Sequence, residues 1–311
     1  MSVSTQCAVH ADWLLAIDDS KPTMFRNRYV VIEGNEIVAI TDTKPASAEL
    51  VAEGSEMLVM PGFINLHNHC SSSVMFRGLS EDMPTDNTTD FTVDLVYGLL
   101  MPFNAAAIEL LSGEETRAIF DLGLLEIIKG GTTTLMEQFR MGQQGTCEAA
   151  DEMGLVVSAD MNYRKNLWTS EKAQSVMKPL MKFVDIAIGN EEDAEKCLGV
   201  SAKNIDVTSG EIDPEEYKPV IKKLLDEFDF KKIAITLRES LSADDNNWSA
   251  IYFDGKDLLF GKKYPVRIVD RVGGGDAFAA GIIYGNLQEK WESQEILDFA
   301  VASSAISHTF H

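Results

Sequence analysis

The sequence has little that would suit an exported, membrane-bound or nucleic-acid-binding protein. It has four cysteines in 311 residues and no CxxC pair, which favours a reducing cytoplasm over a disulfide framework. Basic residues number 27 against 49 acidic ones, and the net charge of −22 argues against nucleic acid or an anionic membrane as a partner. No stretch approaches 18 apolar residues, and the N-terminus lacks the features of a signal peptide. We therefore expect a cytoplasmic protein that acts on a small molecule, with homo-oligomerisation left open.

The sequence also lacks a Pro/Gly/Ser-rich linker and internal repeats, although its composition changes near the middle. Residues 1–147 contain 3 Lys and 5 Arg, whereas residues 148–311 contain 15 Lys and 4 Arg. Such a shift indicates a domain boundary. We predict two segments, 1–147 and 148–311, with the crossover between about Met141 and Ser158, inside a helix followed by an apolar strand.

Apolar periodicity predicts an α/β protein throughout. The first 60 residues are typical of short strands, with Glu33 to Asn35 as one turn. A helix is predicted over 113–130, between acidic residues in its first turn and a Gly-Gly stop, with a strand after it. Downstream the predicted strands are 155–162, 184–189, 231–237 and 248–253, and the predicted helices are 171–183, 191–198, 214–228, 274–288 and 293–308.

Two of the five histidines close the apolar strand of "VMPGFINLHNH". His67 and His69 are at i and i+2, so both rings leave the strand on one face and can converge on a zinc or iron ion. The plain alternative is two loop histidines, since HxH is common by chance. The other histidines lie in no second strand-end motif, and a hydrolytic metal needs three or four protein ligands.

"VMPGFINLHNH", "FRGLSEDMP" and "GLLEIIKGGTTTLME" together resemble the start of the amidohydrolase superfamily, in its cytosine-deaminase, guanine-deaminase and chlorohydrolase-like branch. The resemblance covers nearly all of residues 1–145. It implies a small β-unit and the start of a (β/α)8 barrel, with His67 and His69 as ligands of Zn2+ or Fe2+. In the family the metal activates water against an N-heterocycle. The later metal ligands have no counterpart here.

Three consecutive glycines open a long helix in "VDRVGGGDAFAAGIIYG". Gly273, Gly274 and Gly275 would let backbone N–H groups approach an anion closely, and the helix N-terminus adds its positive dipole end. Asp276 follows directly, where a carboxylate can take a proton from a hydroxyl that attacks a γ-phosphate. The plain alternative is a glycine-rich helix start packed on a neighbour.

"DMNYRKNLW", "IGNEEDAEKCLG", "AITLRES" and "VDRVGGGDAFAAG" together resemble the PfkB, or ribokinase-type, sugar kinases, and closely the 2-keto-3-deoxygluconate kinases. The resemblance covers about residues 148–311 and implies ATP and Mg2+. It implies Asp276 as catalytic base and Gly273 to Gly275 as anion hole. For the other motifs it implies the following roles: Arg164 on the substrate carboxylate or the phosphates, Asn190 and Asp193 as a magnesium-associated pair, and Arg238 by the nucleotide phosphates. For "NEED" alone, a helix N-terminus with favourable acids is the better reading.

The expected fold is thus the start of an amidohydrolase barrel joined to the C-terminal part of a ribokinase-like α/β sandwich. Upstream of residue 148 the sequence has no counterpart of the lid strands and sugar contacts that such kinases carry. Three functions stay open: a sugar-acid kinase, ranked first; a metal-dependent amidohydrolase; and an inactive fusion of two half-domains with uncovered apolar faces. The chain itself is a natural fusion, a designed chimera, or two proteins joined only in the written sequence.

Overall fold

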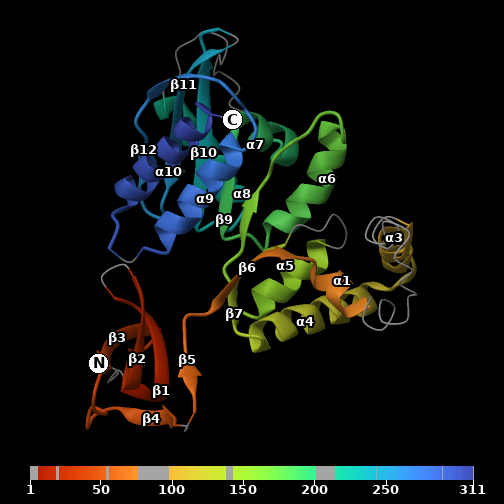
Figure 1. Ribbon diagram of the computed structural model, residues 1–311. Helices are drawn as coiled ribbons and strands as arrows, with labels where there is room; N and C mark the ends of the chain where they lie inside the picture. The colour runs from red at the N-terminus through yellow and green to blue at the C-terminus, as the bar shows by residue number, and fades with distance from the viewer. Residues whose placement is uncertain are drawn as a thin grey trace, which may run out of the picture. The chain divides into compact units, whose positions relative to one another are not determined.

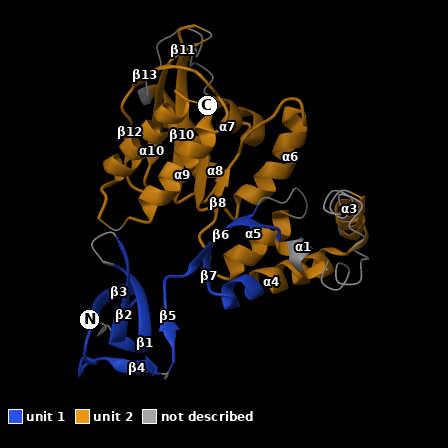
Figure 2. Cartoon of the chain, in the orientation of Figure 1, with its two compact units in different colours: residues 1–69, 125–138 blue, residues 70–124, 139–311 orange. Residues whose placement is uncertain are grey.

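The structure is a computed structural model and describes residues 6–18, 21–53, 56–75, 98–137, 143–200, 214–242, 244–288 and 290–310. Its backbone contacts divide the chain into two units, which Figure 2 distinguishes by colour. Unit 1 holds Met1–His69 and Leu125–Gln138, and unit 2 holds Cys70–Leu124 and Phe139–His311.

Unit 1 begins with a five-stranded sheet in the order β3-β2-β1-β4, and β5 also pairs with β1. The long strands β1 and β2 run antiparallel, and Gly34, with φ of +64°, allows the tight turn from β2 into β3. Ala11, Leu14 and Val30 form the small core. Strands are confirmed over this segment, but two of them, β1 and β2, have 13 residues each and are not short as predicted. The bounds are β1 Gln6–Asp18, β2 Lys21–Glu33, β3 Glu36–Thr41, β4 Glu49–Ala52 and β5 Leu58–Val59.

Two further strands of unit 1 pair in parallel, β6 (Phe63–Asn68) and β7 (Thr132–Glu137). Between them in sequence lies the predicted helix, α4 (Gly113–Lys129), whose C-terminal residues belong to unit 1. This β-α-β order agrees with the start of a barrel. The described residues, however, contain no closed barrel, and Ile64 and Leu66 of β6 remain exposed.

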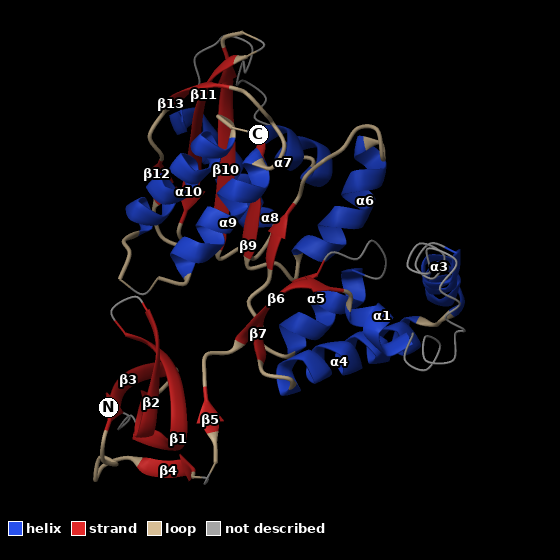
Figure 3. Ribbon diagram, viewed as in Figure 1, coloured by secondary structure: helices blue, strands red, loops and turns tan. Residues whose placement is uncertain are grey.

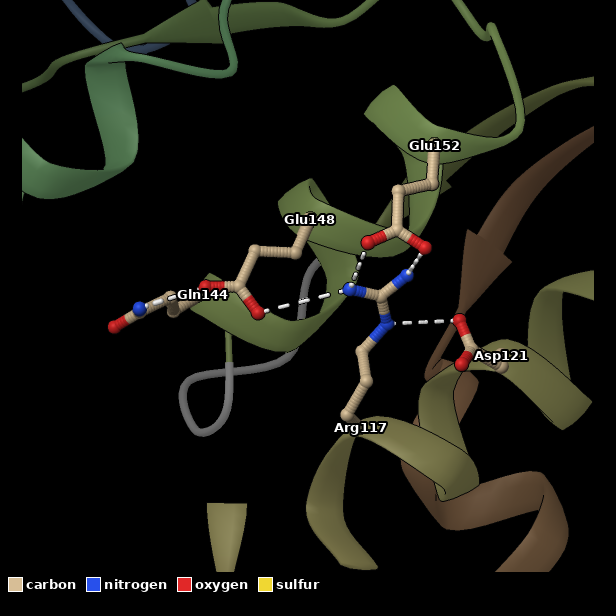
Figure 4. A network of polar contacts seen from close by, with 5 residues as sticks. All are labelled: Arg117, Asp121, Gln144, Glu148 and Glu152. Atoms are coloured by element: carbon tan, nitrogen blue, oxygen red, sulfur yellow. Dashed lines mark hydrogen bonds and ion pairs between the residues drawn. The ribbon is translucent and has the colours of Figure 1, made fainter. Parts of the chain in front are cut away.

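The rest of α4 packs within unit 2 against α5 (Gln143–Glu152). A Cβ at Gly145 of α5 would collide with the ring of Phe120, so the two helices approach closely at this point. Figure 4 shows the polar part of the contact. Arg117 Nε lies 2.8 Å from Asp121, and its terminal nitrogens lie 2.8 Å from Glu152 and 3.7 Å from Glu148. Two shorter helices, α1 (Cys70–Met75) and α3 (Met101–Leu110), also belong to this unit.

The main sheet of unit 2 has six strands in the order β12-β11-β10-β9-β8, with β13 also paired to β11. β8, β9 and β10 are parallel to one another, whereas β11 is antiparallel to β10, β12 and β13. Parallel central strands buried on both faces are expected to be rich in Ile and Val, as "VDIAIG" and "KKIAITL" are. The bounds are β8 Ser158–Asp160, β9 Ile186–Asn190, β10 Lys232–Ser240, β11 Asp245–Phe253, β12 Leu258–Phe260 and β13 Tyr264–Arg267.

Helices cover both faces of this sheet (Figures 1 and 3). Ile233 and Ile235 of β10 pack with α6, α7 and α8, and Ala234 between them packs with α9 and α10, as the alternation of a strand requires. The result is a three-layer α/β/α arrangement, which confirms the α/β prediction. The bounds are α6 Ser170–Met181, α7 Glu191–Leu198, α8 Lys218–Glu227, α9 Gly274–Asn286 and α10 Ser293–Ser307. Across the described parts of the chain, no helix combines the length and the apolar character that crossing a membrane requires.

Candidate active site

Two of the residues singled out from the sequence, Asn190 and Arg238, lie toward the carboxyl ends of the parallel strands, and Asp160 lies at the same edge. Asn190 is the last residue of β9 and pairs in register with Thr236 of β10, and Arg238 follows two residues later. Asp160 is the last residue of β8. In α/β sheets ligands bind at this edge, because the loops that follow each strand meet there.

The glycine turn, residues 273–275, forms the N-terminus of the 13-residue helix α9. Gly273 has a left-handed backbone with φ of +83°, and its carbonyl accepts a hydrogen bond of 2.8 Å from Ala277 N–H. Within the described part of the chain, no side chain caps this helix start. The first backbone N–H groups of a helix lack intrahelical acceptors, so this terminus can receive an anion.

The three glycines differ in their surroundings, and the structure gives a reason for glycine at two of them. Gly273 needs its left-handed backbone conformation. Gly274 is buried, and a Cβ on it would collide with the ring of His308. Gly275 is exposed, and a Cβ on it would meet no atom of the described residues within 4 Å. The packing alternative weighed from the sequence is therefore correct for Gly274 alone, and Gly275 faces open space.

Asp276 lies in the first turn of α9 and is exposed. It belongs to a group of charges with Asp160, Asp193 and Arg164. Burial raises the pKa of Asp160 to about 6, although part of the residue is exposed, and the charges of Asp193 and Asp276 act in the same direction. The charge of Arg164 opposes this rise in the pKa of Asp160 and also a burial-driven rise in the pKa of Asp193. Two predicted site residues, Asp276 and Arg164, thus lie close enough to influence the same carboxylate.

Asn190 and Asp193 form a capping box at the start of α7. Asn190 Oδ1 accepts a 2.9 Å hydrogen bond from Asp193 N–H, and Asp193 Oδ2 accepts one of 2.9 Å from Asn190 N–H. The other oxygen, Oδ1, accepts a 2.7 Å bond from Tyr163 N–H. The structural alternative weighed for "NEED" therefore accounts for both side chains. A direct bond from Asp193 to magnesium would compete with these contacts, and the magnesium role of the pair, through water, stays a prediction.

Arg238 is exposed on β10, and its charge opposes the rise in the pKa of Glu191 that burial causes. Glu191 follows Asn190 directly, so Arg238 lies beside the same helix start. The Arg238 guanidinium thus supplies positive charge at this edge of the sheet.

His67 and His69 do converge, as the i, i+2 spacing predicts. Their Nε2 atoms lie 3.1 Å apart and the two rings meet edge to face. A tetrahedral zinc with Zn–N bonds of 2.0–2.1 Å would hold two such nitrogens about 3.3 Å apart, so the pair fits one ion. Over the described residues, however, no cluster of three or more His, Cys, Asp and Glu side chains could hold a metal. The donor set of a hydrolytic centre is thus incomplete there, and we derive no reaction from it.

Sequence reasoning missed three residues of this region. Asp160 could have been found in "SADMNYR", because it lies near the end of a predicted strand and precedes Arg164 by only four residues. Asn162, between them, has a φ of +40°, which is rare outside glycine. Ser304 and His308, which contact the glycine turn from α10, lie 30 and 34 residues beyond Gly274. Nothing local in the sequence marks such a contact.

Comparison with known proteins assigns the two halves to different relatives. The model of the family described as "pfkB family carbohydrate kinase" matches residues 144–310. The crystal structure of 2-dehydro-3-deoxygluconokinase from Thermotoga maritima is similar with 38% identity and a TM-score of 0.54, over 62% of this chain and 59% of that one. The 5-dehydro-2-deoxygluconokinase of Clostridium perfringens is 29% identical over 186 residues, which are 60% of this chain and 49% of the relative.

The N-terminal half is similar to deaminases. The 5'-deoxyadenosine deaminase of Methanococcoides burtonii is 34% identical over 160 residues, 51% of this chain and 33% of the relative. The chain thus spans between a third and a half of the length of these curated relatives. The two resemblances read from the motifs are confirmed, and the chain is chimeric in its relationships.

Proposed function

Because the chain belongs to the pfkB family of carbohydrate kinases, we propose that it transfers the γ-phosphate of ATP to a hydroxyl of a sugar acid, 2-keto-3-deoxygluconate. The observation that carries the proposal is the placement of Asp276, directly after the glycine turn and beside the uncapped N-terminus of α9. The 38% identity to a 2-dehydro-3-deoxygluconokinase supports the substrate class.

In this proposal the N–H groups of the glycine turn bind phosphate oxygens, and the open space beside Gly275 admits them. Asp276, which is exposed, accepts the proton of the substrate hydroxyl as that oxygen attacks. Its carboxylate lies next to the anion site and would repel a phosphate bound there alone. When a substrate hydroxyl lies between the two, the carboxylate can accept the proton of that hydroxyl.

The two arginines supply positive charge at the same edge of the sheet. Arg164 contacts the substrate carboxylate or the phosphates, and Arg238 the nucleotide phosphates; both are exposed. Mg2+, when bound, neutralises phosphate charge during transfer. Asn190 and Asp193 act on it through water, because their side-chain oxygens already accept the backbone hydrogen bonds of the capping box.

The test is ADP formation by the full chain with ATP, Mg2+ and 2-keto-3-deoxygluconate. We expect turnover that depends on the sugar acid and is lost in Asp276→Asn, while ADP still binds, because the amide keeps the shape but cannot take the proton. Asp229→Asn is the matched control, since Asp229 is exposed just before β10, at the other end of that strand. Wild-type protein without sugar-dependent ADP formation, or Asp276→Asn with full activity, would refute the proposal.

A second candidate is metal-dependent hydrolysis of an N-heterocycle by the N-terminal half, favoured by the 3.1 Å approach of His67 and His69 and by the deaminase relatives. Metal analysis of the purified chain tests this hydrolase function independently of the kinase function. Stoichiometric zinc or iron that disappears in His67→Ala would support a metal site. A protein free of metal after preparation with zinc would remove this candidate.

A further inference from the structure

The C-terminal end of α10 contacts the glycine turn through Ser304 in its last turn and through His308, the residue that caps it. Ser304 is fully buried, and its hydroxyl donates a 2.7 Å hydrogen bond to the carbonyl of Gly274. The ring of His308, also buried, occupies the space where any Cβ on Gly274 would lie. These contacts join residues 30 and 34 positions apart.

Hydrogen bonds to two consecutive carbonyl groups of the glycine turn fix the directions of the N–H groups in the same peptide units. A peptide unit is planar and trans, so the N–H of the next residue points opposite to the carbonyl. Gly273 C=O is held by Ala277 N–H and Gly274 C=O by Ser304 Oγ, with distances of 2.8 and 2.7 Å. The N–H groups of Gly274 and Gly275 are thereby aimed out of the helix start.

His308 is itself fixed in place. Its Nδ1 lies 2.6 Å from the carbonyl oxygen of Ser304, so Nδ1 carries the proton and donates it. Its own carbonyl accepts a 2.8 Å bond from Val269 N–H, and its ring lies 4.6 Å from that of Trp248. Because one residue contacts both Val269 and Gly274, it sets the path of the segment that enters the glycine turn.

We infer that Ser304 and His308 are positioning residues for phosphate binding, so that the C-terminal turn of α10 sets the nucleotide affinity of a site on α9. Neither residue needs to touch the nucleotide. The inference rests on the proposed function, because it takes the glycine turn to be a phosphate site.

The experiment is calorimetric titration of the full chain with MgADP. Removing one buried hydrogen bond that orients a donor should weaken binding about five- to tenfold, so we expect this loss in Ser304→Ala and in His308→Ala. His308→Gln should retain most of the affinity, since its amide can still donate to Ser304 O. Ser303→Ala, the neighbouring half-buried serine of α10, is the matched control and should bind as wild type.

A reciprocal rescue separates positioning from general loss of stability. Gly274→Ala should weaken MgADP binding because the new methyl collides with the His308 ring. The double variant Gly274→Ala, His308→Ala should bind more tightly than Gly274→Ala alone, since the space is free again. A measured thermal unfolding midpoint for each variant shows that folded protein is compared.

Each outcome decides something. Wild-type affinity in both Ser304→Ala and His308→Ala, or additive losses in the double variant, overturns the inference. MgADP binding by the wild type without phosphorylation of 2-keto-3-deoxygluconate overturns the proposed substrate and leaves the inference standing. A wild type that does not bind MgADP overturns both.

Discussion

Gly275 offers a substitution in which stability and function should change in opposite directions. It lies in the first turn of α9, and a Cβ on it would meet no atom within 4 Å among the residues that the structure describes. Alanine is favoured over glycine in a helix by about 0.5–1 kcal/mol. Gly275→Ala should therefore raise the free energy of unfolding by up to that amount, because it restricts the unfolded chain and strains nothing in the folded one.

Nucleotide binding should weaken in the same variant. The added methyl occupies the open space through which a phosphate oxygen would reach the backbone N–H groups. A hydrogen bond to a charged group contributes about 1.5–3 kcal/mol, so the loss of one raises the Kd for MgADP by about 10- to 150-fold. Gly273→Ala is the contrasting variant: its φ of +83° makes alanine cost about 1–2 kcal/mol of stability.

Urea denaturation and calorimetric MgADP titration of the same preparations measure both quantities. The decisive pattern is a Gly275→Ala protein that is at least as stable as wild type and binds MgADP more weakly. Unchanged affinity would refute the placement of a phosphate beside Gly275. A clear loss of stability would refute the open space that the structure assigns there.

Two further predictions concern charges in unit 2. Arg117→Ala should lower the free energy of unfolding by about 1–2 kcal/mol. Arg117→Lys should be more stable than Arg117→Ala but less stable than wild type, since lysine cannot bind both oxygens of Glu152. Equal stability of wild type and both variants in urea denaturation would contradict the network. Asp160, whose pKa is raised to about 6, keeps its proton in the folded protein at pH values where the unfolded chain, with a pKa near 4, has lost it. Its contribution to stability is thus present below about pH 4 and is lost as pH rises through about 6, so Asp160→Asn should gain stability relative to wild type over that interval; a stability difference that does not change from pH 4 to 7 would contradict the raised pKa.

The fold was predictable wherever the signal was local. The helix predicted over 113–130 is α4, Gly113–Lys129, because acidic residues at its start and a Gly-Gly stop mark its ends. The two closing helices were likewise predicted to within two residues. The strand predicted over 155–162 is shorter, Ser158–Asp160. The prediction was too long because the apolar residues 155–157 precede the part of the chain that pairs with its neighbour.

The candidate site could be proposed from the sequence as a set of motifs but not as a set of contacts. Gly273, Asp276 and Arg164 could be singled out because glycine runs and charged strand ends carry a chemical meaning of their own. The reason for Gly274, in contrast, is the ring of His308, a residue 34 positions away whose type alone suggests nothing. Pairings of this kind depend on how α9 and α10 cross, which no local pattern encodes.

Similarity to other proteins divides the chain at one place, and the packing of its helices divides it at another. The pfkB match begins at residue 144, inside α5, which spans Gln143–Glu152. Yet α5 is held by α4, through Arg117 and through Phe120 against Gly145, and α4 precedes the match entirely. A chain cut at residue 147 would divide α5 and leave Glu148 and Glu152, two of the three carboxylates around Arg117, on the other piece. The kinase-like part therefore depends on α4 for packing, and its activity should be measured in the full chain.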